Sequence, residues 1–376
     1  MRAVARAQGI VLLVACLPFV SQVAVASTNA PPQANPAPGE SSASEQVLVT
    51  PVVTSLSDGS PQTVYTLPDG EVVTIVTPPS GFDPLTASDA KLAEYDFPSR
   101  PTDDADLVEW RQAMSAVQRV GQPSGPVSVD VGDAVQRYAT VVSNWGGVVA
   151  GNTSGSTNTY VAVKGNLTIP STGTCDSTNG VGAWIGLGGV PPKDLVQQGV
   201  ECGHASLGSG SGFHPFTEFV DASSSPAGWA PAKFCMIDGW TLPVGHVIYQ
   251  NMSYQTSSNT AYFFLEDESS GGLTESCHIS RPSSAYTFAG NTAEWITEAP
   301  LGELHAVDFG TIGFSNAQLE LNSSGTWANL NTQALTKYKD GWSSSDYCVY
   351  PPGSLGSDGK SFSDVWYSGD CYYELH

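Results

Sequence analysis

From about residue 138 onward, the chain alternates short runs of β-branched and aromatic residues with clusters of Gly, Ser, Asn and Thr. Segments 160–169, 246–254 and 261–265 are three such runs, and none of them has a helical period. Many short strands separated by turn residues are typical of antiparallel sheets packed face to face. The sequence therefore predicts an all-β fold, an antiparallel β-sandwich, over residues 138–325.

The N-terminus has the features of a signal peptide. Arg2 and Arg6 precede an apolar run over residues 10–20, and Ala24–Ala26 offers a small-residue cleavage site. We interpret residues 1–26 as a signal, which predicts a secreted protein. No other apolar run in the sequence is long enough to span a bilayer, so no membrane partner is expected once the signal is removed.

The cysteines are consistent with export. Cys16 lies inside the predicted signal, where the sequence also resembles a lipoprotein box and leaves a lipid anchor as the second interpretation. The other six are an even number, which in an exported chain favours three disulfides. We predict the pairs Cys175–Cys202, Cys235–Cys277 and Cys348–Cys371, the last within a C-terminal extension, 326–376, that we interpret as an appended cap or strand pair.

Residues 27–137 are interpreted as a prosegment and linker of mixed structure. A hairpin is predicted around residues 68–70, and apolar residues at helical spacing predict one helix within 104–120. The apolar stripe of this helix needs a partner surface, for which the cleft side of the sandwich is one candidate. Apolar packing has to dominate that contact, because the region holds 15 Asp and Glu against 5 Lys and Arg. The alternative is a permanent subdomain that completes the fold.

The charge balance excludes some partners. The whole chain carries 36 Asp and Glu against 14 Lys and Arg, a formal net charge of −22. Such a surface repels nucleic acid and anionic membranes, so neither is an expected partner. The imbalance is self-repulsive at neutral pH and relaxes as carboxylates take up protons. It therefore favours acidic working conditions, with a simple solubility role as the alternative.

Several catalytic machineries are absent from the sequence. It contains no His-Glu-x-x-His zinc helix, no Gly-x-Ser-x-Gly elbow, no Walker loop and no Asp-Thr/Ser-Gly loops. The cysteines lack zinc-ligand spacing, and the six His are scattered. We therefore expect neither a metal nor a cofactor.

Five short segments, taken together and in order, resemble the glutamic peptidases, also called eqolisins. They are Ser143–Gly147 (Ser-Asn-Trp-Gly-Gly), Ala183–Leu187 (Ala-Trp-Ile-Gly-Leu), Leu195–Val200 (Leu-Val-Gln-Gln-Gly-Val), Thr292–Glu298 (Thr-Ala-Glu-Trp-Ile-Thr-Glu) and Asp308–Ile312 (Asp-Phe-Gly-Thr-Ile). The resemblance covers about residues 140–320. It implies a concanavalin A-like or lectin-like jelly roll and a secreted, pepstatin-insensitive acid endopeptidase, made as a zymogen. We expect it to act on polypeptides as a monomer.

The resemblance also assigns roles. It places the catalytic Gln at Gln197 and the catalytic Glu at Glu294, without metal or covalent intermediate. It assigns substrate binding to Trp145, Trp184, Glu218 and Glu298.

The chain departs from the family pattern at three places. Gly188 stands where a carboxylate is expected, and Ala299 replaces a carboxylate after Glu298. The run Phe216–Phe219 has smaller aromatic residues than the family's run, which should reshape a wall of the substrate cleft.

A Gln and a Glu can supply the chemistry of peptide hydrolysis. One carboxyl group can act first as general base and then as general acid if its pKa lies near the working pH, and burial raises the pKa of a Glu. A Gln amide orients water and donates to the oxyanion without titrating itself. On a strand, Glu294 and Glu298 share one face, whereas Gln197 and Gln198 face opposite ways.

The main alternative is a glycan-active or glycan-binding protein on the same sandwich. Glu218 and Glu294 would then form a retaining glycosidase pair about 5 Å apart. Gln197 would have no role in such a site.

Overall fold

The computed structural model describes the chain from residue 46 to residue 368. Within that range it leaves out residues 69, 118–119, 122–124, 131–144, 152–159, 173–174, 176–178, 191–193, 204–211, 221–239, 270–271, 282–287, 289, 299–304, 322–324, 339, 342–346 and 351–353.

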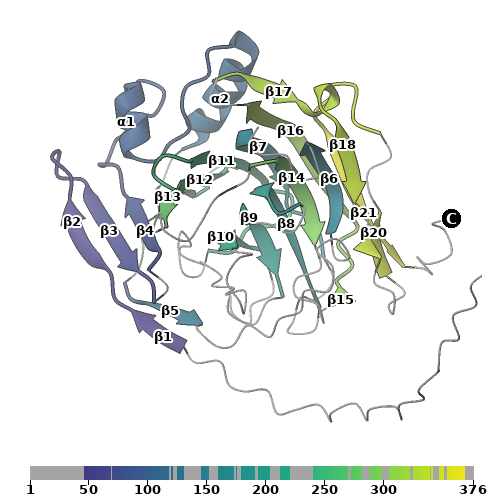
Figure 1. The fold of residues 1–376 in the computed structure, drawn as a ribbon, viewed down its shortest axis with the longest axis horizontal. Helices are drawn as coiled ribbons and strands as arrows, with labels where there is room; N and C mark the ends of the chain where they lie inside the picture. The colour runs from purple at the N-terminus through teal and green to yellow at the C-terminus, as the bar shows by residue number, and fades with distance from the viewer. Residues whose placement is uncertain are drawn as a thin grey trace, which may run out of the picture. The chain divides into compact units, whose positions relative to one another are not determined.

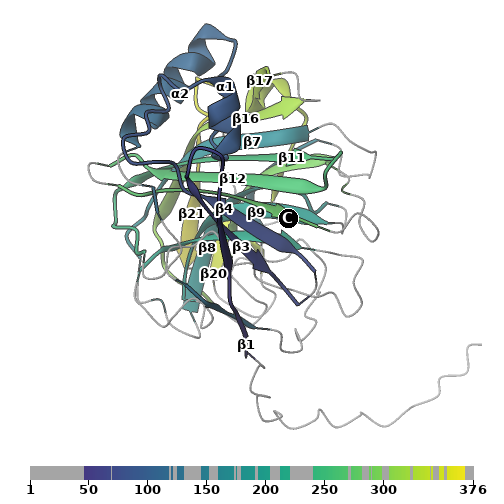
Figure 2. The same cartoon turned by 90° about the vertical axis from the view of Figure 1, so that its left-hand side faces the viewer.

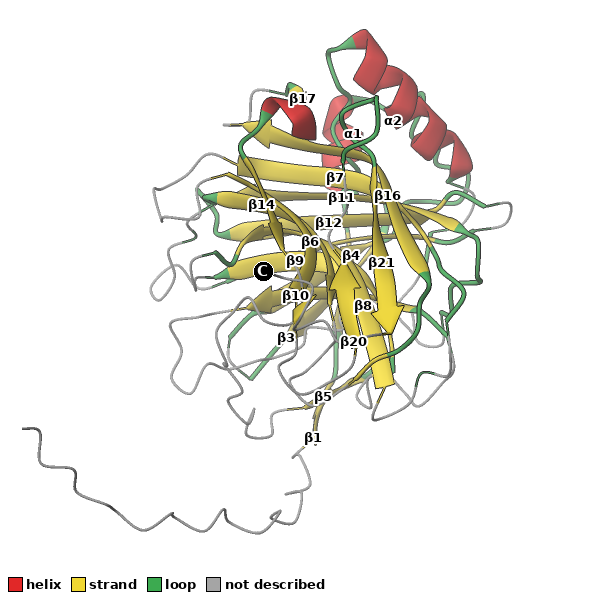
Figure 3. Ribbon diagram, turned by 90° about the vertical axis from the view of Figure 1, so that its right-hand side faces the viewer, coloured by secondary structure: helices red, strands yellow, loops and turns green. Residues whose placement is uncertain are grey.

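Two sheets, antiparallel except where β15 pairs with β8, make up most of the structure (Figures 1 and 3). The seven-stranded sheet has the order β10-β9-β8-β14-β6-β18, with β15 beside β8. Its strands are β6 (Trp145–Gly151), β8 (Asn179–Gly188), β9 (Leu195–Cys202), β10 (His214–Val220), β14 (Thr292–Glu298), β15 (His305–Ala306) and β18 (Leu335–Tyr338).

The twelve-stranded sheet has the order β19-β20-β21-β16-β7-β11-β12-β13-β4-β3-β2, with β17 beside β16. Its strands are β2 (Val52–Ser55), β3 (Pro61–Thr66), β4 (Val72–Val76), β7 (Tyr160–Thr168), β11 (Val247–Gln255), β12 (Thr260–Asp267), β13 (Thr274–Ser280), β16 (Thr311–Leu321), β17 (Trp327–Asn329), β19 (Asp340–Gly341), β20 (Tyr347–Tyr350) and β21 (Phe362–Ser368). A separate pair joins β1 (Gln46–Val49) to β5 (Val127–Asp130).

The main core lies between the two sheets and confirms the predicted sandwich. It combines Ile185 and Trp295 of the seven-stranded sheet with Val163, Met252 and Phe263 of the other. Alternation along each strand produces this arrangement, because successive side chains of a strand point to opposite faces. The indole Nε1 of fully buried Trp295 donates to the backbone oxygen of Lys164 in β7 (3.0 Å), which satisfies its polar group inside the core.

The N-terminal region forms the predicted hairpin and helix, and one helix that was not predicted. The hairpin is β3–β4, and the helix is α2 (Asp104–Ala116). The additional helix, α1 (Asp89–Glu94), is capped by the hydroxyl of Ser88, which accepts from the Lys91 backbone N–H (3.3 Å). Six residues are too few for a helical period to emerge from the sequence.

The apolar stripe of α2 packs on the outer face of the twelve-stranded sheet. Trp110 and Met114 share a buried cluster with Tyr249 of β11 and Phe264 of β12, and Figure 2 shows α1 and α2 together beside the strands of this sheet. The suggestion that this stripe packs on the cleft side of the sandwich is therefore wrong. The helix packs instead on the outer face of the twelve-stranded sheet, because β11 and β12 present aromatic side chains there.

The N-terminal region also extends the sheet and the core. Strand β4 pairs with β13, and Tyr65, Leu67, Val73 and Ile75 enter the main core. Burying an apolar side chain of this size contributes about 1.5–3 kcal/mol each. These contacts support the alternative that the N-terminal region is a permanent subdomain. Removal of residues 27–137 stays a prediction.

Charge pairs cross the same boundary, although both parts of the chain are acidic. Lys164 of β7 is almost fully buried, and its Nζ lies 3.7 Å from Asp106 Oδ1 of α2. His278 of β13 contacts Asp96 (2.8 Å). In both pairs the carboxylate belongs to the N-terminal region, so local electrostatics adds to the apolar packing.

The C-terminal stretch is part of both sheets. Strand β18 pairs with β6 in the seven-stranded sheet, and β21 pairs with β16 in the twelve-stranded sheet. The expected strand pair exists as β20–β21, but the stretch 326–376 is woven into the sandwich and is no appended cap.

One predicted disulfide is present, between Cys175 and Cys202, with its Cα atoms 5.7 Å apart. Cys277 is also disulfide-bonded, and its predicted partner Cys235 lies outside the described residues. The predicted pair Cys348–Cys371 lies outside the described side chains as well. In the part of the chain that the structure describes, no helix combines the length and apolar character needed to cross a bilayer.

Candidate active site

Gln197 and Glu294 lie in one row across the seven-stranded sheet. The Cα register pairs Glu218 with Gln197, Gln197 with Gly186, and Gly186 with Glu294. Residues opposite one another in neighbouring strands point to the same face, so the side chains of Glu218, Gln197 and Glu294 all lie on one face of the sheet. Strands lie about 4.8 Å apart, which places the backbones of Gln197 and Glu294 about 10 Å from each other. Gly186 has no side chain, so no side chain of β8 stands between them, and the side chains of Trp184 and Leu195 pack over this position.

The row faces away from the main core. It lies among a separate apolar cluster whose members are Trp145, Val149, Trp184, Val190, Leu195, Phe216 and Ile296. Gln198, the neighbour of Gln197, points the opposite way, and its Nε2 donates to the backbone oxygen of Phe264 across the sandwich (2.9 Å). The two adjacent glutamines therefore occupy opposite faces.

An aromatic wall stands beside the row. The rings of Trp145 and Trp184 meet edge to face, with centroids 4.9 Å apart. The indole Nε1 of Trp184 donates to Glu298 Oε2 (2.9 Å), which fixes the ring. The structure thus places Trp145, Trp184 and Glu298 together, next to the strand positions of Gln197 and Glu294.

The polar groups of the row are buried. Glu294 is 0% exposed, Gln197 4% and Glu218 5%. Gln197 Nε2 donates to Glu218 Oε2 (2.5 Å). Gln197 Oε1, Glu218 Oε1 and both carboxyl oxygens of Glu294 have no hydrogen-bond partner among the described residues. Each buried polar atom without a partner lowers the free energy of unfolding by about 1–3 kcal/mol, so their concentration in one row marks a polar binding site.

Burial shifts the pKa of both carboxyl groups upward. It raises the pKa of Glu294 well above its ordinary value. The nearby hydroxyl of Thr292 lowers this pKa only slightly, because its proton is donated to the backbone oxygen of Gly188 (3.0 Å). Burial raises the pKa of Glu218 to about 8, against the opposing effect of the Gln197 hydrogen bond. Both groups hold a proton in acid solution when the row is empty.

Gly188 explains the missing carboxylate. Its φ of +92° lies in the left-handed region, and a Cβ atom there would overlap the backbone oxygen of Asp194. No aspartate can occupy this position without moving the backbone. In the run Phe216–Phe219, Phe216 belongs to the site cluster, whereas Phe219 belongs to the main core. The change of aromatic size there reaches the cleft only through Phe216, and Ala299 lies outside the described residues.

The glycosidase pair does not fit the register. Glu218 and Glu294 are three strands apart, about 14 Å between backbones, and Gln197 stands between them. A retaining pair needs its carboxyl groups about 5 Å apart with no side chain between them.

The sequence analysis did not identify the glycine between the two candidate catalytic residues or the apolar neighbour of Gln197. Gly186 separates the two candidate catalytic side chains, while Leu195 lies two residues from Gln197 and shares its face. The period of two along a strand could have identified them. No cluster of three or more His, Cys, Asp or Glu within the described ranges is placed to hold a metal ion.

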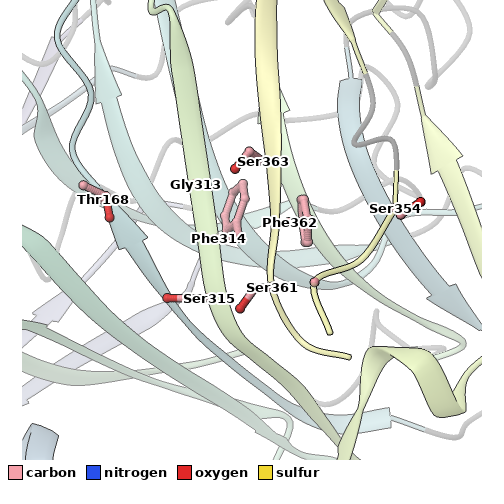
Figure 4. A pocket seen from close by; sticks show the side chains of 9 residues that line it. Thr168, Gly313, Phe314, Ser315, Ser354, Ser361, Phe362 and Ser363 are labelled. Carbon is pink, nitrogen blue, oxygen red and sulfur yellow. The ribbon is translucent and has the colours of Figure 1, made fainter. Parts of the chain in front are cut away.

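A surface pocket of about 460 Å³ lies elsewhere, between β7, β16, β21 and the residues before β21 (Figure 4). Its lining consists of Thr168, Gly313, Phe314, Ser315, Ser354, Gly356, Ser361, Phe362 and Ser363. Hydroxyls of this kind bind polar ligands weakly and do not titrate in the range of acid–base catalysis. The pocket therefore offers no second catalytic centre.

Gly186 gives a direct test of the row. A Cβ atom there would lie 2.8 Å from Trp184 Cζ3 and 3.0 Å from Leu195 Cδ1, so Gly186→Ala must displace both side chains. We expect kcat/KM for a denatured protein substrate to fall about 10-fold or more, because small displacements in a catalytic site are costly. Gly182→Ala in the same strand is the control, since its Cβ meets nothing closer than 3.9 Å. Equal activity of the two variants would contradict the assignment.

The fold is an antiparallel β-sandwich whose seven-stranded sheet carries a buried row with one Gln and one Glu as the candidate catalytic pair. The family model described as the peptidase A4 family matches residues 143–347, more than half of the chain. This protein belongs to the peptidase A4 family, and family membership indicates glutamic peptidase activity.

Solved structures of glutamic peptidases are similar in part. Scytalido-glutamic peptidase with a transition state analog inhibitor is 18% identical, covers 60% of this chain and 98% of its own, and has a TM-score of 0.42. SCP-B, an eqolisin bound to the tripeptide Ala-Ile-His, is 16% identical with the same coverages and a TM-score of 0.41. Aspergilloglutamic peptidase from Aspergillus niger is 17% identical, covers 50% of this chain and 99% of its own, and has a TM-score of 0.36. The search of curated proteins found no relative.

Proposed function

We propose that this protein is a secreted endopeptidase that acts in acid, in which Gln197 and Glu294 activate water against a peptide bond. The observation that carries the proposal is the single row of Gln197, Gly186 and Glu294, whose unpaired polar atoms lie beside buried aromatic and apolar side chains. An extended polypeptide with apolar side chains suits these surroundings.

The chemistry follows from the two side chains. Ionised Glu294 takes a proton from a water molecule, whose oxygen attacks the carbonyl carbon of the peptide bond. The Gln197 amide N–H donates to the oxygen that becomes negative. Protonated Glu294 then gives its proton to the leaving nitrogen, and the C–N bond breaks. No bond forms between enzyme and substrate.

The working pH depends on Glu294. Burial raises its pKa in the empty row, which favours the protonated form needed for the second step. Hydrogen bonds from water and substrate to the carboxylate lower that pKa again, which makes the base form available in mild acid. The acidic composition and the neutral state of Glu218 in acid support the same working range.

Export and partners complete the proposal. The N-terminal signal features support secretion, and a net charge of −22 argues against nucleic acid and anionic membranes as partners. We propose polypeptides as substrates, with the protein acting as a monomer.

Hydrolysis of denatured protein at about pH 3–4 with pepstatin present tests this function, with a panel of glycans run in parallel. Gln197→Ala should reduce turnover by about 10²–10³ through loss of the oxyanion donor. Gln198→Ala is the matched control: its amide faces the core, so it should lose stability while the folded fraction keeps its turnover. Glycan cleavage, or inhibition by pepstatin, would overturn the proposal.

A further inference from the structure

We propose that Glu218 is a positioning residue whose proton decides which end of the Gln197 amide faces Glu294. The inference rests on the proposed function. In it, the N–H end faces the reacting carbonyl only while Glu218 is protonated.

The contact between the two side chains is direct. Gln197 and Glu218 are opposite one another in β9 and β10, and Gln197 Nε2 donates to Glu218 Oε2 (2.5 Å). A primary amide has a donor end and an acceptor end. Because Nε2 is held by Glu218, Oε1 is left as the free end, with no partner among the described residues. That free end is an acceptor, whereas a developing oxyanion needs a donor.

A proton on Glu218 reverses the arrangement. An ionised carboxylate can only accept hydrogen bonds, so it holds the N–H end of the amide. A carboxylic acid has one O–H, which can donate to Gln197 Oε1. The terminal torsion of Gln is roughly two-fold, so a half-turn of the amide exchanges its ends within the same space. Nε2 then points away from Glu218, along the row that leads through Gly186 to Glu294. The step takes up one proton at a Glu218 oxygen and breaks no covalent bond.

The surroundings of Glu218 favour the proton. Burial is the main cause, and carboxylates facing it from β9, β14 and the N-terminal region act in the same direction: Glu201, Glu298 and Glu71. The guanidinium of Arg281 is paired with Glu71 and lies over the ring of Phe219, on the core side. The ring of His214, in the same strand as Glu218, bonds the backbone oxygen of Trp240 through Nδ1 (2.9 Å). Burial and the three carboxylates, against the Gln197 hydrogen bond, hold the pKa of Glu218 at about 8.

The pH dependence of turnover tests the proposal. The acid limb of kcat belongs to ionisation of Glu294, and the alkaline limb belongs to loss of the Glu218 proton. In Glu218→Gln, the new amide has an N–H that can donate to Gln197 Oε1, and because an amide does not titrate, this hydrogen bond no longer depends on pH. We expect the alkaline limb to move up by about one pH unit or more, with the acid limb unchanged. Glu218→Leu, which has no donor, should lower kcat about 10²-fold at every pH. An unmoved alkaline limb in Glu218→Gln, or wild-type kcat in Glu218→Leu, would overturn the proposal. Rates are compared only where circular dichroism shows each variant folded.

A second measurement does not require catalysis. The side-chain ¹⁵N resonance of Gln197, assigned by its loss in Gln197→Ala, should shift as pH passes the Glu218 titration in the wild type and stay constant in Glu218→Gln. A Gln197 resonance that ignores pH in an enzyme that cleaves peptides overturns the amide proposal and leaves the proposed function standing. A resonance that titrates in a protein without peptidase activity supports the amide contact and sinks the proposed function instead.

Discussion

Glu294→Gln is expected to abolish peptide hydrolysis while the sandwich stays folded. The substitution keeps the volume of the side chain but removes the group that takes and returns a proton. General acid–base catalysis of this kind contributes about 10²–10⁴, and one residue here serves both halves of the reaction, so we expect a loss near the upper end. Glu294 is fully buried and holds a proton in acid when the row is empty, so a neutral amide suits its surroundings. Turnover of denatured protein and the thermal midpoint are the two measurements.

Glu275→Gln is the matched control for this experiment. Glu275 is another buried glutamate whose pKa burial raises well above its ordinary value. It lies in β13 of the twelve-stranded sheet, opposite Leu265, and its side chain is not part of the row. A loss of activity in both variants would mean that a buried glutamate of this fold is needed for stability alone. Near-normal turnover in Glu294→Gln would remove Glu294 from the mechanism.

The folded protein is expected to be most stable in acid and to lose stability between about pH 4.5 and pH 9. Burial raises the pKa of Glu218 and of Asp364 to about 8 and that of Glu266 to about 9. In the unfolded chain these groups titrate near pH 4. A group whose folded pKa is raised contributes its stability fully below the unfolded pKa and loses it as pH rises through the folded value. The native state therefore binds more protons than the unfolded state in this window.

The size of the effect is large for a single domain. One such carboxyl group removes up to about 1.4 kcal/mol of unfolding free energy for each pH unit in the window. Three groups acting over about three units would remove an amount similar to the whole stability of an ordinary domain, about 5–15 kcal/mol. Asp58 opposes the trend, because its contact with Lys91 lowers its pKa, but both side chains are exposed and screened by solvent.

Urea unfolding at pH 4, 6 and 8 measures this dependence. Asp364→Asn should make the slope with pH shallower, because it removes one buried titration and leaves an acceptor for the Thr297 hydroxyl (2.7 Å). Asp358→Asn in an exposed turn is the comparison, and it should leave the loss of stability above pH 4.5 unchanged. Stability that rises from pH 4 to pH 8 would contradict the expectation.

Local patterns predicted the sandwich and much of the site. Runs of β-branched and aromatic residues between turn clusters identified β7, β11 and β12, and the period of two residues along a strand placed Glu294 and Glu298 on one face of β14. The same period required Gln197 and Gln198 to diverge. These features depend only on the alternation of a strand, which the sequence contains.

Register and strand order could not be predicted in this way. Glu294 lies opposite Gly186 although more than a hundred positions separate them in the chain, and no local pattern fixes that pairing. The contact of Glu218 with Gln197 depends on the β9–β10 register for the same reason. The partner surface of α2 was missed because an apolar stripe shows that a helix packs but not on which sheet. The C-terminal strand pair was expected and is present as β20–β21, but the place of β18 at an edge of the seven-stranded sheet could not be predicted, because only the whole fold defines that edge.

Lys164 contacts both β14, the strand that carries Glu294, and helix α2 of the N-terminal region. Its backbone oxygen receives the indole proton of Trp295, the residue after Glu294, while its ammonium group meets Asp106 of α2 and lies 4.7 Å from the Trp327 ring. Burial lowers the pKa of this lysine, and the nearby carboxylates of α2 oppose that shift. Without α2, the Nζ of Lys164 would lose Asp106 and Glu109 as partners, while its backbone oxygen would still accept from Trp295 of β14. We therefore expect that any change in the contact of α2 with Lys164 also affects the position of β14, the strand that carries Glu294.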